Sequence, residues 1–93
     1  MVVHANSTDA RAGHPPRVGF VVSRAVGNAV VRNRMKRILR ALMSARVGQL
    51  PDGVDLVVRA NPELTGAPRT LLVQDLDRLL ATVLRRVAPR EGH

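Results

Sequence analysis

The segment from Ala10 to Pro51 carries nine basic residues and no acidic residue. Like charges one helical turn apart repel each other, so this segment cannot neutralise its own charge. It must fold with its cations toward solvent and its apolar residues toward a core. Over the whole chain, 15 Lys and Arg face 7 Asp and Glu, a formal net charge of +8. This imbalance favours a polyanion as partner.

Length and composition exclude several classes of protein. A chain of 93 residues suffices for one small domain and is too short for two. The absence of Cys excludes disulfides and thiolate metal sites, and it fits a reducing compartment. The sequence has no run that approaches the roughly 18 apolar residues of a membrane span, and its first residues do not resemble a signal peptide. We therefore expect a cytoplasmic protein with no membrane partner.

Hydrophobic periodicity predicts three strands and two helices. The expected strands are residues 1–5, 17–24 and 54–60, and the expected helices are residues 29–47 and 69–87, with residues 88–93 as a tail. The last strand is apolar on both faces, which indicates an interior position in the sheet. The order predicts an α+β fold, a single small domain in which helices pack on one small sheet. A strand–helix–strand unit is right-handed by default.

The helix expected at residues 29–47 has an apolar stripe and a basic arc, and Asn28 is placed to cap its start. The expected stripe is Val31, Met35, Ile38, Leu42 and Ala45, with Leu39 beside it. The opposite arc, about 140° wide, holds Arg32, Asn33, Lys36, Arg37 and Arg40, and Arg34 lies nearer the stripe. Gly48 is expected to end the helix. An arc of cations without acids favours nucleic acid and does not say which one. A basic face kept only for solubility is the weaker alternative, because such faces mix both signs of charge.

Residues 18–37 read VGFVVSRAVGNAVVRNRMKR. This segment resembles the signature of the bacterial ribonuclease P protein. That signature has a strand ending in Ser and a basic residue, then Gly-Asn-Ala-Val, then Arg-Asn-Arg and further basic residues. The later strand and the last helix also agree with the family in order and length, so the resemblance covers most of the chain.

The resemblance implies an RNA-binding subunit of ribonuclease P, which assists removal of the 5′ leader from precursor tRNA. Its partners would be ribonuclease P RNA and precursor tRNA, with no small-molecule substrate. Catalysis would belong to the RNA, with Mg²⁺ held by RNA and substrate and no catalytic or metal-binding residue in the protein. It also implies a mixed sheet whose βαβ crossover is left-handed, against the default.

The resemblance assigns two groups of site residues. The implied RNA-binding residues are Arg24, Asn28, Arg32, Asn33, Arg34, Lys36, Arg37 and Arg40. The candidates for a leader cleft between sheet and helix are His4, Phe20 and Ser23. Asn28 suits a helix cap better than a base contact. Phe20 suits a core position as well as a stacking platform.

One departure from the family concerns the start of the chain. Family members begin with a basic segment and an aromatic-bearing helix ahead of the first strand, and this chain has no Tyr or Trp. We expect an N-terminally truncated form. A ribosomal or other structural RNA-binding protein without a role in cleavage remains the main alternative. A DNA-binding regulator is disfavoured because strands flank the basic helix, and a self-sufficient nuclease because acids and His are not clustered.

Overall fold

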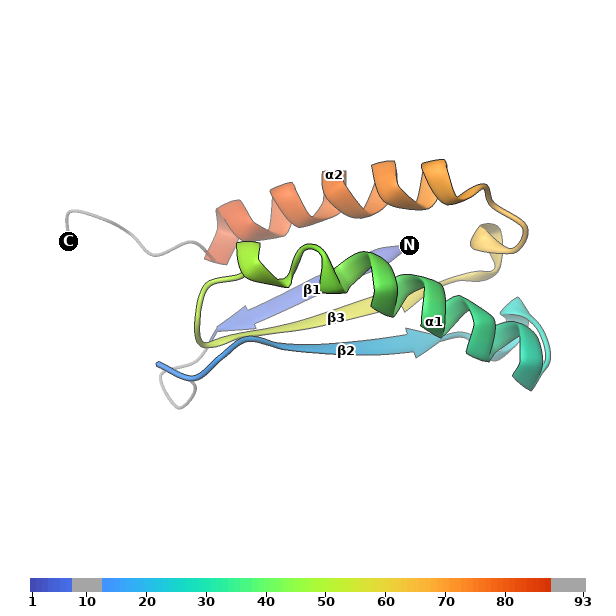
Figure 1. Cartoon of the computed structure of the whole chain (residues 1–93), viewed down its shortest axis with the longest axis horizontal. Helices are drawn as coiled ribbons and strands as arrows, with labels where there is room; N and C mark the ends of the chain where they lie inside the picture. Colours follow the sequence, from blue (N-terminus) through green and yellow to red (C-terminus); the bar gives the residue numbers. More distant parts are fainter. Residues whose placement is uncertain (8–12, 88–93) are drawn as a thin grey trace.

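The computed structural model describes residues 1–7 and 13–87, in which two strands are followed by a helix, a third strand and a second helix (Figure 1). The elements are β1 (Val2–Ser7), β2 (Arg17–Val22), α1 (Ala29–Ser44), β3 (Val54–Ala60) and α2 (Arg69–Val87). Short 3-10 turns follow β2, α1 and β3, at Arg24–Val26, Val47–Gln49 and Pro62–Leu64. The predicted tail, residues 88–93, lies outside the described residues.

The sheet has the strand order β1-β3-β2, with β3 antiparallel to β1 and parallel to β2. The prediction of β3 as an interior strand is therefore confirmed. Its burial alternates, however: Val54, Leu56, Val58 and Ala60 are buried, while Val57 is 38% exposed. The sheet thus has one core face and one open face.

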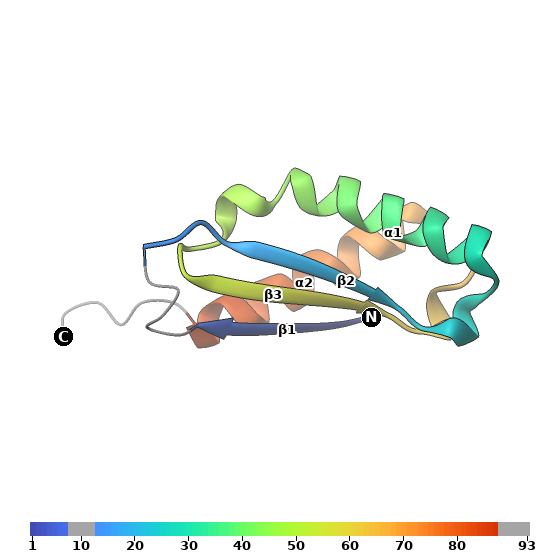
Figure 2. The ribbon, with the colours of Figure 1, turned by 90° about the horizontal axis from the view of Figure 1, so that it is seen from below.

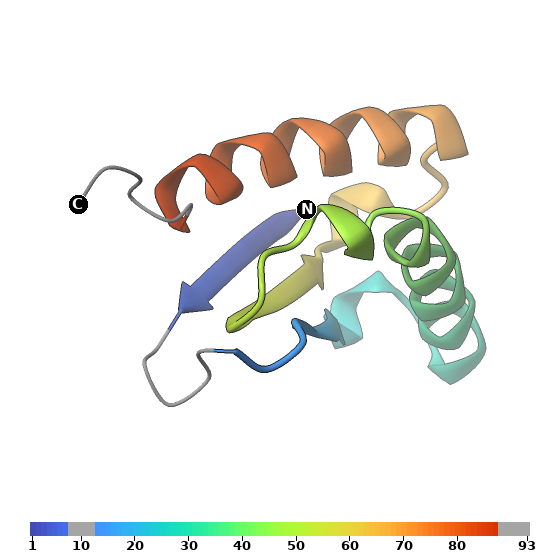
Figure 3. The same ribbon diagram turned by 60° about the vertical axis from the view of Figure 1, so that its left-hand side comes forward.

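Both helices cover the same face of the sheet, α1 along β2 and α2 along β1 (Figures 1 and 3). Seen from below, the other face carries no helix (Figure 2). The path from β2 through α1 to the adjacent β3 makes a left-handed crossover, which Figures 1 and 2 let the reader follow. The α+β class, the mixed sheet and this unusual handedness agree with the expectation from the family resemblance.

The strand boundaries differ from the predicted ones at two places. β1 runs on to Ser7 because Asn6 and Ser7 stay in register with Asp55 and Val54 of β3. β2 ends at Val22, two residues earlier than predicted. There the Ser23 hydroxyl accepts a hydrogen bond from the Ala25 N–H at 3.3 Å and starts a 3-10 turn.

The end predicted for α1 was wrong, because the helix stops at Ser44 and Gly48 lies in the following 3-10 turn. The cause is Arg46. Its Nη1 donates to the Leu42 carbonyl at 2.7 Å, which satisfies a carbonyl of the last helical turn. Its Nε donates to the Asp77 carboxylate of α2. A partner 31 residues away along the chain left no local sequence signal.

The predicted apolar stripe of α1 was only partly correct. The buried residues are Met35, Leu39, Leu42 and Met43, whereas Val31 and Ala45 are exposed and Ile38 is half-buried. The buried face is therefore turned by roughly 60° from the predicted one. This rotation brings the row Arg32, Lys36 and Arg40 to the margin of the buried face.

Gly27 and Gly19 allow a matched test of local packing. A Cβ on Gly27 would lie 2.9 Å from the Cβ of Val31, whereas a Cβ on Gly19 would meet no atom within 4 Å. We expect Gly27→Ala to lower the free energy of unfolding by about 1–3 kcal/mol through overpacking. Gly19→Ala should leave it nearly unchanged. Urea denaturation of both variants measures the difference, and equal stabilities would contradict the packing described for Gly27.

The contact between Arg46 and Asp77 should make stability depend on pH. The hydrogen bonds and charge of Arg46 hold the pKa of Asp77 below its usual value, and partial burial opposes this shift. A carboxyl whose pKa is depressed in the folded state stabilises the fold above its unfolded pKa, about 3.9. That contribution is lost as the pH falls through the folded pKa. Asp77→Asn should therefore have a flatter profile of unfolding free energy below about pH 5. The exposed Asp52→Asn is the charge-matched control; parallel profiles for Asp77→Asn and the wild type would refute the coupling.

Candidate nucleic-acid interface

The start of α1 is held in place by the residues just before it. The Ser23 N–H donates to the Ala60 carbonyl at 3.1 Å, which ties the end of β2 to the end of β3. Asn28 Oδ1 accepts from the Val31 N–H at 3.0 Å, so the structure contains the predicted helix cap. These contacts fix the direction of α1 relative to the sheet. The first cation of the helix, Arg32, follows one turn after the cap.

The predicted RNA-binding side chains lie on two sides of α1. Arg32 and Lys36 are half-buried, and Arg40 is exposed further along the same row. Arg34 lies about 160° away from Arg32 around the helix and borders a hollow between α1 and the start of α2. The exposed members of the predicted set are Arg24 in the 3-10 turn, Asn28 at the cap, and Asn33, Arg34, Arg37 and Arg40 on α1.

The acidic side chains do not neutralise this helix. Four acids form ion pairs, and each of them pairs with a cation outside α1. The pairs are Asp55–Arg17, Asp77–Arg46, Asp75–Arg78 and Glu63 with the Met1 amino group. In the described parts of the chain no ion pair reaches a basic side chain of α1. Its charge is therefore available to an external polyanion.

The Nε–H group of Arg32 lacks a hydrogen-bond acceptor among the described residues. Its Nε is shielded from solvent and has no hydrogen-bond partner within residues 1–7 and 13–87. A buried donor without an acceptor costs about 1–3 kcal/mol. An anionic oxygen bound at the Arg32 guanidinium is the kind of acceptor that would relieve this cost.

The three candidates for a leader cleft are not brought together. His4 is exposed on the open face of the sheet, Phe20 lies on the helix-covered side, and Ser23 caps a 3-10 turn. The open face carries three cross-strand rows that sequence reasoning did not single out, although strand alternation predicts them. By register these rows are Val2–Arg59–Val21, His4–Val57–Gly19 and Asn6–Asp55–Arg17.

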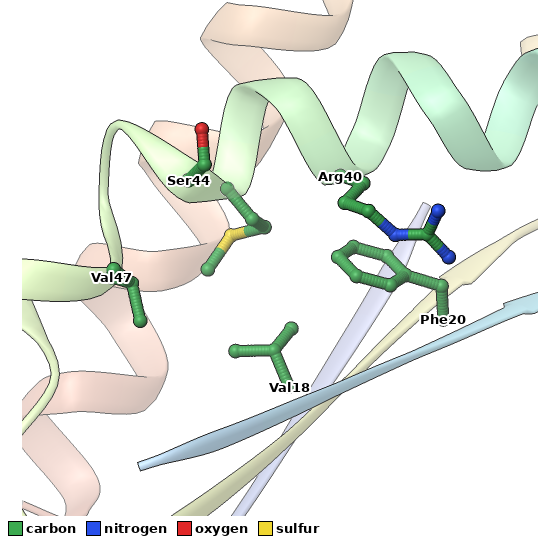
Figure 4. Close-up of a pocket in the computed structure, with 6 residues that line it drawn as sticks. Val18, Phe20, Arg40, Ser44 and Val47 are labelled. Atoms are coloured by element: carbon green, nitrogen blue, oxygen red, sulfur yellow. The ribbon is translucent and has the colours of Figure 1, made fainter. Parts of the chain in front are cut away.

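A pocket of about 250 Å³ opens between β2 and the end of α1 (Figure 4). The Arg40 guanidinium carbon lies 6.0 Å from the centre of the Phe20 ring, at the distance of a cation–π contact. The pocket is lined by Val18, Phe20, Arg40, Met43, Ser44 and Val47. Of these, only Phe20 and Arg40 were candidates from the sequence. The other four could not be grouped before the contact of α1 with β2 was known.

Two further observations limit the chemistry of the described residues. They contain no group of three or more His, Asp or Glu placed to hold a metal ion. Among them, neither helix is both long enough and apolar enough to cross a bilayer.

Comparison with known proteins adds the decisive observation: the family model described as Ribonuclease P matches residues 1–84. The chain belongs to the ribonuclease P protein family. A ribonuclease P protein component from Beutenbergia cavernae is 54% identical over 83 residues, which cover 89% of this chain and 68% of that protein. One from Streptomyces avermitilis is 51% identical over 90 residues, covering 90% of this chain and 73% of that protein.

Solved structures of the family agree with this assignment. The RNase P protein of Staphylococcus aureus matches with a TM-score of 0.73 and 25% identity, covering 86% of this chain and 71% of that one. The RNase P protein of Thermotoga maritima matches with a TM-score of 0.66 and 26% identity, covering 94% and 76%. The resemblance drawn from residues 18–37 is thereby confirmed.

RNA binding by the row Arg32, Lys36 and Arg40 can be tested by alanine substitutions, with a control that removes the same charge from another helix. Arg32→Ala and Lys36→Ala should each weaken binding to ribonuclease P RNA. Each should also reduce the slope of log affinity against log salt by roughly 0.7–0.9, because one phosphate contact is lost. Arg78→Ala removes the same charge from α2, where Arg78 pairs with Asp75, and should leave the slope nearly unchanged. Filter binding at several salt concentrations measures this, and equal effects of all three variants would contradict a localised interface.

Proposed function

We propose that this chain is the protein subunit of ribonuclease P, which assists removal of the 5′ leader from precursor tRNA. The observation that carries the proposal is the row of cations on α1, which no described acid compensates and which begins within the segment that resembles the family signature. The relatives that match are themselves named ribonuclease P protein components.

The subunit belongs to an endoribonuclease, and we assign the chemical step to the RNA. Mg²⁺ in nucleotide chemistry is bound by one or two carboxylates together with phosphate oxygens. Here Asp55, Asp75 and Asp77 each lie against an Arg, and the described residues gather no group of metal ligands. This donor set does not suit a Mg²⁺ site in the protein. We therefore place the metal on RNA and substrate.

The protein would contribute binding energy and charge neutralisation. Each phosphate that meets a basic side chain releases condensed counterions. The row Arg32, Lys36 and Arg40 would bind ribonuclease P RNA in this way, with Arg24, Arg34 and Arg37 extending the contact around the start of α1. Neutralised phosphates repel a second RNA less. Precursor tRNA would therefore associate at lower Mg²⁺ concentration.

For the leader of precursor tRNA we propose the open face of the sheet. That face exposes apolar area at Val57 and Val21, which suits unpaired bases, and cationic area at Arg59, which suits phosphate. His4 lies on the same face, opposite Val57 in the register. Ribonuclease P RNA and precursor tRNA would be the partners, in the cytoplasm, with no membrane and no small-molecule substrate.

A cleavage assay tests the function. Ribonuclease P RNA and precursor tRNA are combined at a Mg²⁺ concentration too low for efficient cleavage by the RNA alone. The protein should then raise the rate of 5′-leader removal at least several-fold. The Arg32→Ala/Lys36→Ala double variant should lose most of this stimulation, and Arg78→Ala should keep it. Salt-sensitive RNA binding without stimulation would instead indicate a structural RNA-binding protein.

A further inference from the structure

We propose that the pocket between β2 and the end of α1 binds one unstacked base of the RNA held by α1. The proposal rests on the RNA-binding role proposed above and adds a base-binding site to the phosphate contacts. It concerns the helix-covered side of the sheet. It is therefore separate from the open face assigned to the leader.

The shape of the pocket suits one planar ring system. Its volume is about 250 Å³, below the range of about 300–1,000 Å³ typical of pockets for drug-sized ligands. Val18 and Phe20 of β2 line the pocket on the side of the sheet (Figure 4), and the end of α1, with Met43 and Ser44, also lines it. Val47, at the mouth, is 40% exposed. β2 is an edge strand in the order β1-β3-β2, so no neighbouring strand of this sheet blocks access from that side.

The side chains of the pocket offer the contacts that a base uses. The Phe20 ring provides an aromatic face for stacking, which tolerates any base. The Ser44 hydroxyl points away from β2 and donates to the Ala41 carbonyl at 3.0 Å (Figure 4), so the surface that faces a bound base is apolar.

The row of cations beside the pocket favours RNA over uncharged apolar ligands. Arg40 stands over the Phe20 ring and is the last member of the row Arg32, Lys36 and Arg40, with each step about 6 Å along the helix. A strand whose phosphates follow this row reaches the pocket at its end. Arg40 can then contact a phosphate while the adjacent base enters beside Phe20. An uncharged apolar ligand would gain nothing from the row, and an acidic peptide would gain nothing from the aromatic wall.

The composition of the chain makes the test unusually clean. Phe20 is the single Phe, and the chain has neither Tyr nor Trp. All phenyl proton signals in an NMR spectrum therefore belong to Phe20, and the protein adds no tryptophan fluorescence. The probes are a short single-stranded RNA with one 2-aminopurine and the same RNA with an abasic site at that position.

We expect binding to quench the 2-aminopurine, to shift the Phe20 ring protons, and to give a nuclear Overhauser contact between this ring and the base. Phe20→Leu should lower affinity for the intact RNA by roughly tenfold without changing the salt slope. It should have no effect on the abasic RNA. Arg40→Ala should reduce the slope as well as the affinity.

A second pair of variants keeps the test decisive if Phe20→Leu does not fold. Val47→Ser alters the mouth of the pocket, and Leu71→Ser makes a comparable change at a 51% exposed position on α2, away from both proposed RNA-binding surfaces. Val47→Ser should weaken binding of the intact RNA and not of the abasic RNA, and Leu71→Ser should affect neither. Normal salt-dependent binding that is insensitive to Phe20→Leu, Val47→Ser and the abasic site would overturn the pocket and leave the proposed function intact. Loss of stimulation in the cleavage assay would instead overturn the function.

Two RNAs can supply the base, and the same variant separates them. If Phe20→Leu binds ribonuclease P RNA alone more weakly than the wild type does, the base in the pocket belongs to that RNA. If Phe20→Leu assembles normally with ribonuclease P RNA but then binds precursor tRNA more weakly, and leaderless tRNA equally well, the base belongs to the leader. No effect in either measurement would refute the assignment for both RNAs.

Discussion

The burial of Leu39 and Met43 in the core, where α1 packs against β2, determines most of what this molecule presents to a partner. Burial of such side chains contributes about 1.5–3 kcal/mol each, enough to fix the rotation of the helix about its own axis. With that rotation set, Arg32 and Lys36 lie at the edge of the core and Arg40 reaches the Phe20 ring. The phosphate-binding row and the pocket beside it therefore result from one packing event.

The ion pairs complement this packing. Arg46 closes α1 by binding the Leu42 carbonyl and joins it to α2 through Asp77, while Arg17 binds Asp55 across two neighbouring strands. Each contact pairs an acid with a cation outside α1. The same few interactions thus stabilise the junctions between elements and keep the basic helix unneutralised. Stability and binding are coupled through how the acids are distributed.

Local signals predicted much of the fold. β3 and α2 have the predicted ends, because turn residues and a Pro bound β3 and an unbroken apolar period runs through α2. Gly53, in the turn before β3, has a positive φ, which glycine adopts without a steric penalty, and Asn28 is the predicted cap. Features that depend on distant partners were not predictable in this way. The end of α1 is stabilised by Arg46, which also binds Asp77 of α2, and the general rule for crossovers indicated the opposite hand.

The cations of the candidate site were evident from sequence alone, but their arrangement was not. Periodicity placed the basic arc opposite the core, whereas the structure places Arg32 and Lys36 at its margin and Arg34 on the other side of the helix. Phe20 was equally compatible with core and surface, since a strand pattern does not say which helix covers which face. Its contact with Arg40, 20 positions later, required the seating of α1 on β2.

The segregation of acids from α1 also has a consequence at a distance. Within the described chain α1 carries five cations and no acid, while the acids lie in the turn before β3, on β3, in the 3-10 turn after it and on α2, so positive charge is concentrated on the side of α1. In the field of a polyanion such a body experiences a torque before it makes any contact. Approaching RNA would turn α1 toward itself, so that encounters begin close to the bound orientation.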